Sequence, residues 1–324
     1  MSLASRPALL LSTVSLAAGL LAAPGAAYAA DTTISLTQQQ MAAELKKVAG
    51  TSTAAAENGW KATLSGTGDI AISTSYVVDP AHGRALEESR YGKGPVDTRV
   101  SVAGKGTYYS ILDATSRSVV KMMGRPAVRY VFTAQPSLNL TTYLEDAPTP
   151  AAMLTEDIPA GTKTTHDNGW TDYAFNNGGE RLTVQVADTG ILSQVQISLT
   201  DFTVKVTYAY EPQRVSLPSP AITMDSVTFD RGRAYLDMSR SVAAVANDGA
   251  ADARQAAKGR TVTVSSVRKH VRRQATTFNA GARVKMVKVA DVRGGVRVSA
   301  TNPWTAKTVD YTVKASGRKV TVRG

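Results

Sequence analysis

The residue pattern best suited to covalent chemistry is a serine followed three positions later by a lysine. Ser118 and Lys121 have the spacing at which one class of serine acyl-transfer enzymes places its nucleophile and base. Ser137-Leu-Asn139 resembles the second motif of that class, but Lys163-Thr-Thr165 lacks the glycine of the third. The Ser-x-x-Lys pattern recurs twice further along this basic, serine-rich chain, which indicates chance. The nucleophile should also open a helix, whereas we expect Ser118 in a strand, so we predict no enzyme of this kind.

Acid–base and metal chemistry have few candidate residues. The chain has three histidines and no cysteine, which excludes disulfides, thiolate metal sites and a cysteine nucleophile. His166 beside Asp167 fits half of an acid–base pair, but no third partner is identifiable, and we favour a solvated loop histidine. Motifs for zinc proteases, α/β-hydrolases, nucleoside triphosphates and dinucleotides do not occur. The sequence therefore predicts no enzyme, no metal and no cofactor.

The first 29 residues have the order of a secretory signal peptide. Arg6 precedes an apolar run over residues 8–23, and Ala27-Tyr28-Ala29 predicts cleavage before Ala30. The run is shorter than the roughly 20 residues that span a bilayer, although a retained membrane anchor is the alternative. A lipid anchor needs a cysteine that this sequence lacks. We therefore expect an exported, extracytoplasmic protein of the cell envelope without a lipid anchor.

The charge divides the rest of the 324-residue chain into two segments. The net charge is +11, yet residues 31–225 carry −4 and residues 226–324 carry +14. A stiff, proline-bearing linker at Leu217-Pro218-Ser219-Pro220 falls between these segments. We predict a first domain over residues 30–220 and a small basic α+β domain over residues 226–324.

The first domain reads as a helix followed by antiparallel strands. Thr37 and Gln40 fit a capping box, and Gly50 is placed to end the helix. Beyond it, apolar and polar residues alternate with the period of a half-buried strand, and Asn-Gly and Asp-x-Gly turns separate the strands. Residues 136–158 break this pattern and predict short helical cover. The fold class is therefore α+β, with a curved antiparallel sheet covered by helices.

These strands carry a family resemblance. Trp170, Tyr173 and Phe175 lie in one strand, a Val-x-Asp-x-x-Gly turn starts at Val186, and a last strand runs through Tyr208-Ala-Tyr210-Glu-Pro. This pattern resembles the LolA-like half-barrel family over roughly residues 35–220. The resemblance implies a curved sheet around an apolar cavity that receives acyl chains, and it implies no catalysis. The C-terminal segment carries no pattern of that family.

Aromatic and methionine side chains are the predicted lining of that cavity, because they pack well against irregular apolar chains. The alternative is that they fill a closed core. The predicted lining residues are Trp60, Met122, Met123, Tyr130, Phe132, Tyr143, Met153 and Phe175.

The C-terminal domain is predicted to be small and mostly β. We expect a strand at Val227–Phe229, a helix over residues 241–258 interrupted at Asn247-Asp248-Gly249, and then period-two strands that begin with Val262 and Val264. Its positive charge attracts polyanions, and an anionic membrane or wall polymer is the expected partner; a solvated surface without a partner is the alternative. The residues predicted to bind anionic surfaces are Arg268, Lys269, Arg272, Arg273, Arg283 and Lys285.

Together these features predict a monomeric, non-catalytic envelope carrier that binds an acyl-chain lipid or a lipidated protein. We expect no nucleic-acid partner, because export removes the chain from nucleic acid and few aromatic residues are available to stack on bases. The alternative is a ligand-free, RseB-like envelope sensor that relays its state to a partner protein.

Overall fold

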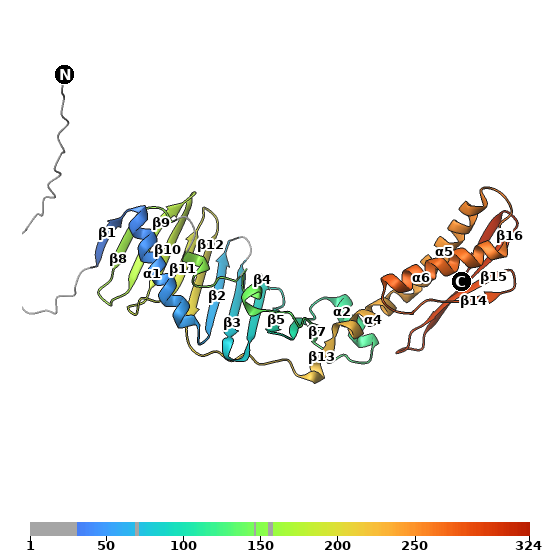
Figure 1. The fold of residues 1–324 in the computed structure, drawn as a ribbon, viewed down its shortest axis with the longest axis horizontal. Helices are drawn as coiled ribbons and strands as arrows, with labels where there is room; N and C mark the ends of the chain where they lie inside the picture. The colour runs from blue at the N-terminus through green and yellow to red at the C-terminus, as the bar shows by residue number, and fades with distance from the viewer. Residues whose placement is uncertain (1–30, 69–70, 146, 155–157) are drawn as a thin grey trace, which may run out of the picture.

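The computed structural model describes residues 31–68, 71–145, 147–154 and 158–324. The predicted signal peptide, residues 1–29, lies outside the described residues. Figure 1 shows an elongated molecule with a large curved sheet at one end and a smaller helix-and-sheet unit at the other. Within the described chain, none of the helices combines the length and apolar character needed to span a bilayer.

The large sheet contains thirteen strands that lie in the order β1-β8-β9-β10-β11-β12-β2-β3-β4-β5-β6-β7-β13. All neighbouring strands are antiparallel except β13, which pairs parallel with β7. The strands are β1 (Thr32–Leu36), β2 (Trp60–Thr67), β3 (Ile72–Asp79), β4 (Arg84–Tyr91), β5 (Asp97–Val102), β6 (Gly106–Ser110), β7 (Tyr130–Ala134), β8 (Gly161–Thr165), β9 (Thr171–Asn177), β10 (Glu180–Val186), β11 (Leu192–Ser198), β12 (Thr203–Ala209) and β13 (Thr223–Asp225).

Two meanders form this sheet, and one strand pair joins them. Strands β2 to β7 follow one another as neighbours, and so do β8 to β12. The seam is the pairing of β12 with β2, in which Ala209 lies opposite Lys61 and Val206 opposite Leu64. The seam therefore creates one continuous surface from two segments that are far apart in the sequence.

Helix α1 (Gln38–Ala56) lies across one face of the sheet, and it begins at the predicted capping box. Thr37 and Gln40 form the predicted capping box, and Met41, Leu45 and Val48 are buried against the strands. The prediction that this helix is the first element is wrong, because β1 precedes it and pairs with β8.

The predicted end of α1 at Gly50 is also wrong. The helix continues for six more residues because Ser52 is fully buried and gains a tertiary hydrogen bond. Its hydroxyl accepts from the Leu192 N–H at 2.9 Å while donating to the Val48 carbonyl at 2.7 Å. Packing against β11 thus outweighs the helix-breaking preference of one glycine, which costs about 1 kcal/mol.

Short helical segments extend the cover of the same face. They are α3 (Leu140–Tyr143) and the 3₁₀ turn η2 (Ala152–Leu154), with a further turn η1 (Pro80–His82) between β3 and β4. The segments α3 and η2 fall where the sequence predicts helical cover. Helix α2 (Ala114–Met122) connects β6 to β7, and its buried residues pack with Met224 of β13 and Phe229.

The predicted proline-bearing linker is preceded by a segment that packs on the sheet. Val215 is 1% exposed. Its N–H donates to Asp79 at 3.2 Å, and its carbonyl accepts from the Arg84 guanidinium at 2.9 Å. Because Asp79 and Arg84 are paired residues of β3 and β4, the chain is fixed to the ends of these strands before it reaches β13.

The C-terminal unit packs two long helices against a four-stranded antiparallel meander (Figure 1). In chain order, a connecting turn and helix come first and the elements of the unit follow: η3 (Pro220–Ile222), α4 (Ser226–Leu236), α5 (Met238–Ala257), α6 (Val264–Gly281), β14 (Lys288–Val292), β15 (Gly295–Thr301), β16 (Thr308–Ser316) and β17 (Lys319–Arg323). The α+β class with a curved antiparallel sheet and a separate small C-terminal sheet is confirmed.

Three local predictions in this unit are wrong. Val227–Phe229 lies in α4 rather than in a strand, because Asp225 caps a helix there by accepting the Thr228 N–H. Helix α5 continues through Asn247-Asp248-Gly249, since Gly249 lies directly against Val271 of α6 and a side chain there would clash. Val264 starts α6 instead of a strand.

The division between residues 30–220 and 226–324 stays a prediction. In the structure β13 belongs to the large sheet, and α4 packs on α2 through Phe229. The core of the C-terminal unit begins with Tyr235 and Met238. Helix α4 therefore contributes side chains to both cores.

The buried carboxylate of Asp79 leads to a testable expectation about stability. Burial alone would raise the pKa of this carboxyl, but hydrogen bonds from His82 and the Val215 N–H lower its pKa below the usual 3.8. An Asp79→Ala variant leaves the Val215 N–H without its partner and should lose about 1–3 kcal/mol of unfolding free energy at neutral pH. Urea unfolding measures this loss.

The same variant has a defined pH dependence. Because the folded pKa is lowered, the contribution of Asp79 is present above about pH 4 and disappears as the pH falls through the folded value. The stability difference from the unmodified protein should therefore shrink at low pH. Asp201→Ala, at an exposed carboxylate, is the matched control; an equal loss in both variants would contradict the role of Asp79.

Candidate functional site

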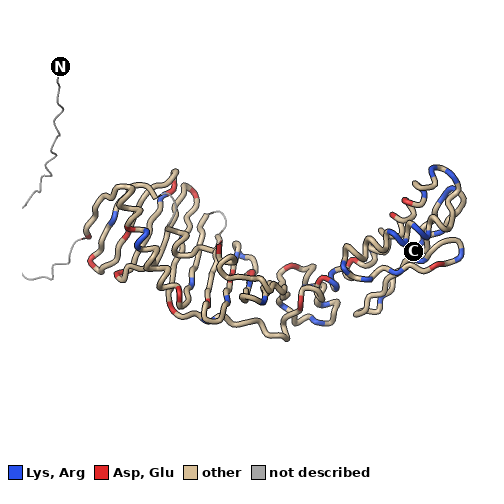
Figure 2. The backbone as a smooth tube through the Cα atoms, in the orientation of Figure 1, with Lys and Arg blue, Asp and Glu red and all other residues tan. Residues whose placement is uncertain are grey.

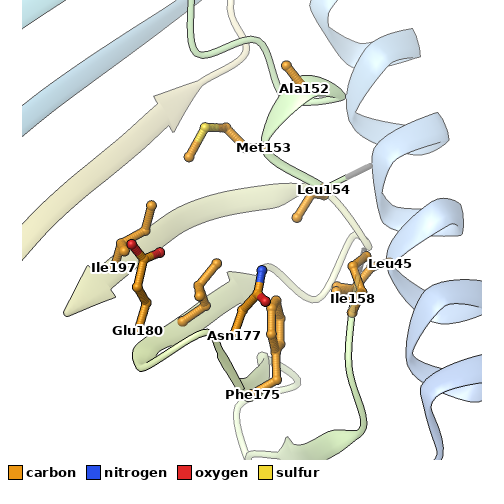
Figure 3. Close-up of a pocket in the computed structure, with 10 residues that line it drawn as sticks. Leu45, Ala152, Met153, Leu154, Ile158, Phe175, Asn177, Glu180 and Ile197 are labelled. Atoms are coloured by element: carbon orange, nitrogen blue, oxygen red, sulfur yellow. The ribbon is translucent and has the colours of Figure 1, made fainter. Parts of the chain in front are cut away.

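An apolar cavity lies between α1, η2 and the strands β9 to β11. Its volume is about 220 Å³. Figure 3 shows side chains from the helix, the η2 segment and the strands surrounding the space. The lining residues are Leu45, Ala152, Met153, Leu154, Ile158, Phe175, Asn177, Glu180, Leu182 and Ile197.

The strand register explains why apolar side chains gather there. Phe175 lies opposite Leu182, which lies opposite Ile197, so three adjacent strands present one apolar row. The polar members, Asn177 and Glu180, are paired residues at the β9–β10 hairpin (Figure 3). The cavity is therefore apolar inside, with its polar groups confined to one hairpin.

Helix α1 is held over this cavity by a polar contact beside Leu45. Glu44 accepts hydrogen bonds from Lys163 of β8 at 3.0 Å and from the Tyr173 hydroxyl of β9 at 2.9 Å. The bonds from Lys163 and Tyr173 lower the pKa of the Glu44 carboxyl. The carboxylate is thus charged at neutral pH and ties the helix to two strands.

A second apolar cluster continues across the seam of the sheet. Trp60 and Ala62 of β2 pack with Val206 of β12, and Met153 and Tyr143 join them from the covering segments. Met153 packs against both this cluster and the α1 cluster. It therefore lies between the lining of the cavity and the apolar surface over the seam.

Polar groups line the far side of this second cluster. The Tyr143 hydroxyl donates to Glu87 at 3.3 Å, and Glu87 lies 3.8 Å from Arg99. Burial, together with the neighbouring Glu87, raises the pKa of Tyr143 to about 12. The same face of the sheet thus changes from apolar beneath α1 to hydrogen-bonding near α3.

The eight predicted lining residues lie in four different places, two in each. Met153 and Phe175 line the cavity, and Trp60 and Tyr143 lie in the adjoining cluster. Met122 is the last residue of α2 and Met123 follows it, and both pack toward α4 and Trp304. Tyr130 and Phe132 lie on β7, with the Phe132 ring 4.6 Å from that of Tyr108.

None of the aliphatic side chains that line the cavity is among the predicted lining residues. Leu45 lies in the helix that the capping box at Thr37 predicts, and Leu182 lies in a strand of the alternating kind that the sequence predicts. Their meeting around one cavity depends on the register of three strands with a distant helix. No local pattern of residues carries that information.

The predicted strand position of Ser118 is wrong. Ser118 lies in α2, where its hydroxyl donates to the Ala114 carbonyl at 2.8 Å. Asp113 caps this helix through the Ser116 N–H, a local signal that the strand assignment overlooked. The helix is exposed at Lys121, and the Ser118 hydroxyl is engaged by its own helix.

The basic residues predicted to bind anionic surfaces divide into paired and unpaired groups. Arg268 and Arg272 of α6 lie 3.3 and 2.8 Å from Asp291, and Arg273 lies 2.7 Å from Asp252. Lys269 lies on the same helix, whereas Arg283 and Lys285 follow its end. Opposite charges from α5 and β14 thus neutralise part of the densest basic cluster.

His166 lies in the loop between β8 and β9, as predicted, but the prediction that it has no partner is wrong. His166 Nδ1 lies 2.9 Å from Asp31, and Nε2 lies 3.1 Å from Asp172. The histidine therefore links the segment before β1 to the β8–β9 turn. Both of its ring nitrogens are engaged by structural contacts, and it does not line the apolar cavity.

The large sheet, curved and open with α1 across one face, has the half-barrel form that the sequence resemblance implied (Figure 1). No family model matches the sequence, and no curated protein matches it.

Solved structures resemble the chain over about half of its length. The Mycobacterium tuberculosis lipoprotein LppX is 12% identical, with 55% of this chain and 98% of LppX covered at a TM-score of 0.33. An uncharacterised conserved protein of Thermus thermophilus is 10% identical, covering 56% and 98% at 0.29. LprF of Mycobacterium bovis is 12% identical, covering 56% and 97% at 0.28. At these identities the likeness concerns the fold alone.

The two carboxylates around His166 lead to a measurable pKa. Hydrogen bonds to Asp172 and then Asp31 raise the pKa of His166 above 6.5. Its contribution to stability is therefore present below about pH 6.5 and disappears as the pH rises through the folded value. An NMR titration of the ring protons should show a midpoint above 6.5, and Asp172→Asn should lower it. A midpoint at or below 6.5 in the unmodified protein would contradict these contacts.

Proposed function

We propose that this protein is a non-catalytic carrier of the cell envelope whose half-barrel binds the acyl chain of a lipid or a lipidated protein. The observation that carries the proposal is the apolar cavity between α1, η2 and β9–β11, with its polar groups at one hairpin. Such a lining suits a ligand whose affinity comes from area burial, at about 0.8 kcal/mol for each buried CH₂. The predicted signal peptide supports export, and the absence of cysteine supports a carrier without a lipid anchor.

The size of the cavity limits how much of a chain it receives. Its volume of about 220 Å³ is smaller than the roughly 300–1,000 Å³ typical of sites for drug-sized ligands. A longer chain needs a continuation, and the seam cluster behind Met153 offers an apolar one. Because a methionine is unbranched and changes shape at low cost, we propose that Met153 moves aside when a long chain binds.

Filling the cavity tests acyl binding directly. An Ile197→Trp variant places a large ring in the cavity and should weaken binding of a fluorescent fatty acid by more than about tenfold, because it displaces at least two methylenes. Leu199→Trp is the matched control, since Leu199 follows the same strand, is 44% exposed and does not line the cavity. Urea unfolding of both variants checks that they fold.

A second experiment distinguishes a lipid carrier from a ligand-free sensor. Native mass spectrometry before and after solvent extraction should find a co-purifying lipid in the unmodified protein. If none co-purifies and none can be loaded, the carrier function is wrong and the ligand-free, RseB-like sensor is favoured. Equal fatty-acid binding by both tryptophan variants would place the ligand elsewhere.

We also propose that the C-terminal unit contacts an anionic membrane or wall polymer, with the protein acting as a monomer. Its support is the net charge of +14 over residues 226–324, and Figure 2 shows Lys and Arg spread over this end of the molecule. Binding to vesicles of phosphatidylglycerol should fall steeply between about 0.05 and 0.5 M salt, because added salt screens exposed charges. Binding that does not change with salt would contradict an electrostatic contact.

A further inference from the structure

We propose that a cavity between α4 and residues 282–285 binds a phosphate group. Its volume is about 410 Å³, within the range of small-molecule sites. Three cationic side chains line it, Arg231 from α4 and Arg283 and Lys285 from the segment after α6. This inference rests on the proposed attraction of the C-terminal unit to anions, and it is independent of acyl binding.

The cations of this cavity differ from the densest basic cluster, because carboxylates do not neutralise them. Within the described chain, Arg231, Arg283 and Lys285 form no ion pair, whereas Arg268, Arg272 and Arg273 are matched by carboxylates of the same unit. Asp230 is the single acidic residue of the lining. The cavity therefore keeps a net positive charge that an incoming anion can neutralise.

The backbone at Arg283 adds a second observation. Arg283 has φ = 49°, a left-handed conformation that glycine usually adopts at the end of a helix. Its N–H donates to Ala280 and the Val284 N–H donates to Asn279, so the conformation terminates α6. An arginine here carries backbone strain that a glycine would avoid, so its side chain can be removed without disturbing this helix end.

The segment that presents these cations is held by side-chain hydrogen bonds. Asn279 donates to the Val287 carbonyl at 2.8 Å and accepts the Val287 N–H at 3.0 Å, which closes the loop containing Arg283 and Lys285. On the opposite wall, the guanidinium of Arg231 lies 6.0 Å from the Trp304 ring, and Trp304 packs edge-on against Tyr235. Both walls are thus fixed before a ligand arrives.

Phosphate fits this set of donors better than a carboxylate does. A carboxylate offers two oxygens, which one arginine can occupy with a bidentate contact. A phosphate monoester offers three unesterified oxygens, enough for cations from three chain positions. Val227, 78% exposed, lies on the same lining and would sit beside the bound anion. An exposed apolar residue beside a phosphate site favours a lipid headgroup over a free phosphate ester as the source.

The strain at Arg283 provides a sharp test with the full chain. Arg283→Gly removes the cation and restores the residue preferred at a left-handed helix end, so folding should be unchanged or slightly more stable. Binding of glycerol phosphate, measured by titration calorimetry, should weaken by about tenfold or more, as expected for loss of a charge-assisted hydrogen bond. Asp230→Asn should strengthen it.

A matched control exists in the same unit. Lys258 ends α5 with φ = 48°, so Lys258→Gly makes the same charge and backbone change away from the cavity. Its glycerol phosphate affinity should stay within about twofold of the unmodified protein. If both glycine variants lose affinity equally, or if Arg283→Gly changes neither glycerol phosphate nor vesicle binding, the site is wrong.

Vesicles that contain phosphatidic acid, a lipid whose headgroup is a phosphate monoester, distinguish the two sources of phosphate. For a lipid headgroup, Arg283→Gly weakens vesicle binding as well as glycerol phosphate binding, and Val227→Thr weakens vesicle binding only. For a soluble phosphate ester, Arg283→Gly weakens glycerol phosphate binding alone. Both results support a phosphate site. Ile197→Trp should leave glycerol phosphate binding unchanged, because this probe has no acyl chain, so a failure of this site and a failure of acyl binding are read separately.

Discussion

The antiparallel pairing of β12 with β2 is the constraint on which the rest of the fold depends. It joins strands separated by about 140 residues, with the Thr207 hydroxyl donating to the Thr63 carbonyl at 3.4 Å across the seam. Closing so long a loop costs conformational entropy. The backbone hydrogen bonds between the two strands and the burial of their apolar side chains must offset this cost. Once formed, the seam places the apolar rows of two meanders on one surface, where α1, η2 and α3 cover them.

The sequence predicts the local features of this fold, because interactions between residues close in the sequence determine them. The Thr37 capping box marks the start of α1, and the Asn-Gly and Asp-x-Gly turns separate strands of the large sheet. The errors occur where distant packing decides the outcome. Ser52 extends α1 past Gly50 through a bond to β11, and Gly249 continues α5 because α6 lies against it. Neither partner is near in sequence.

The candidate site was predictable in kind but not in place. The residue pattern predicts helical cover, the family resemblance implies an apolar cavity beneath it, and Met153 and Phe175 are predicted lining residues that the cavity contains. Met122 and Met123 have the same chemistry, yet they pack on α2 near the C-terminal unit. The same holds for the basic surface. The sequence shows where the cations lie along the chain, but it does not show that Asp291 and Asp252 pair with arginines of α6.

The short parallel strand β13 has a consequence for how the sheet ends. An open antiparallel sheet exposes unpaired backbone groups at each edge, and a long free edge recruits strands from other molecules. At the β7 edge, the chain returns after Val215 and the proline-bearing linker, adds three paired residues and turns at once into α4. The segment that leads to the C-terminal unit thus also protects the β7 edge, so losing the unit together with this connection would turn that edge into a surface for self-association.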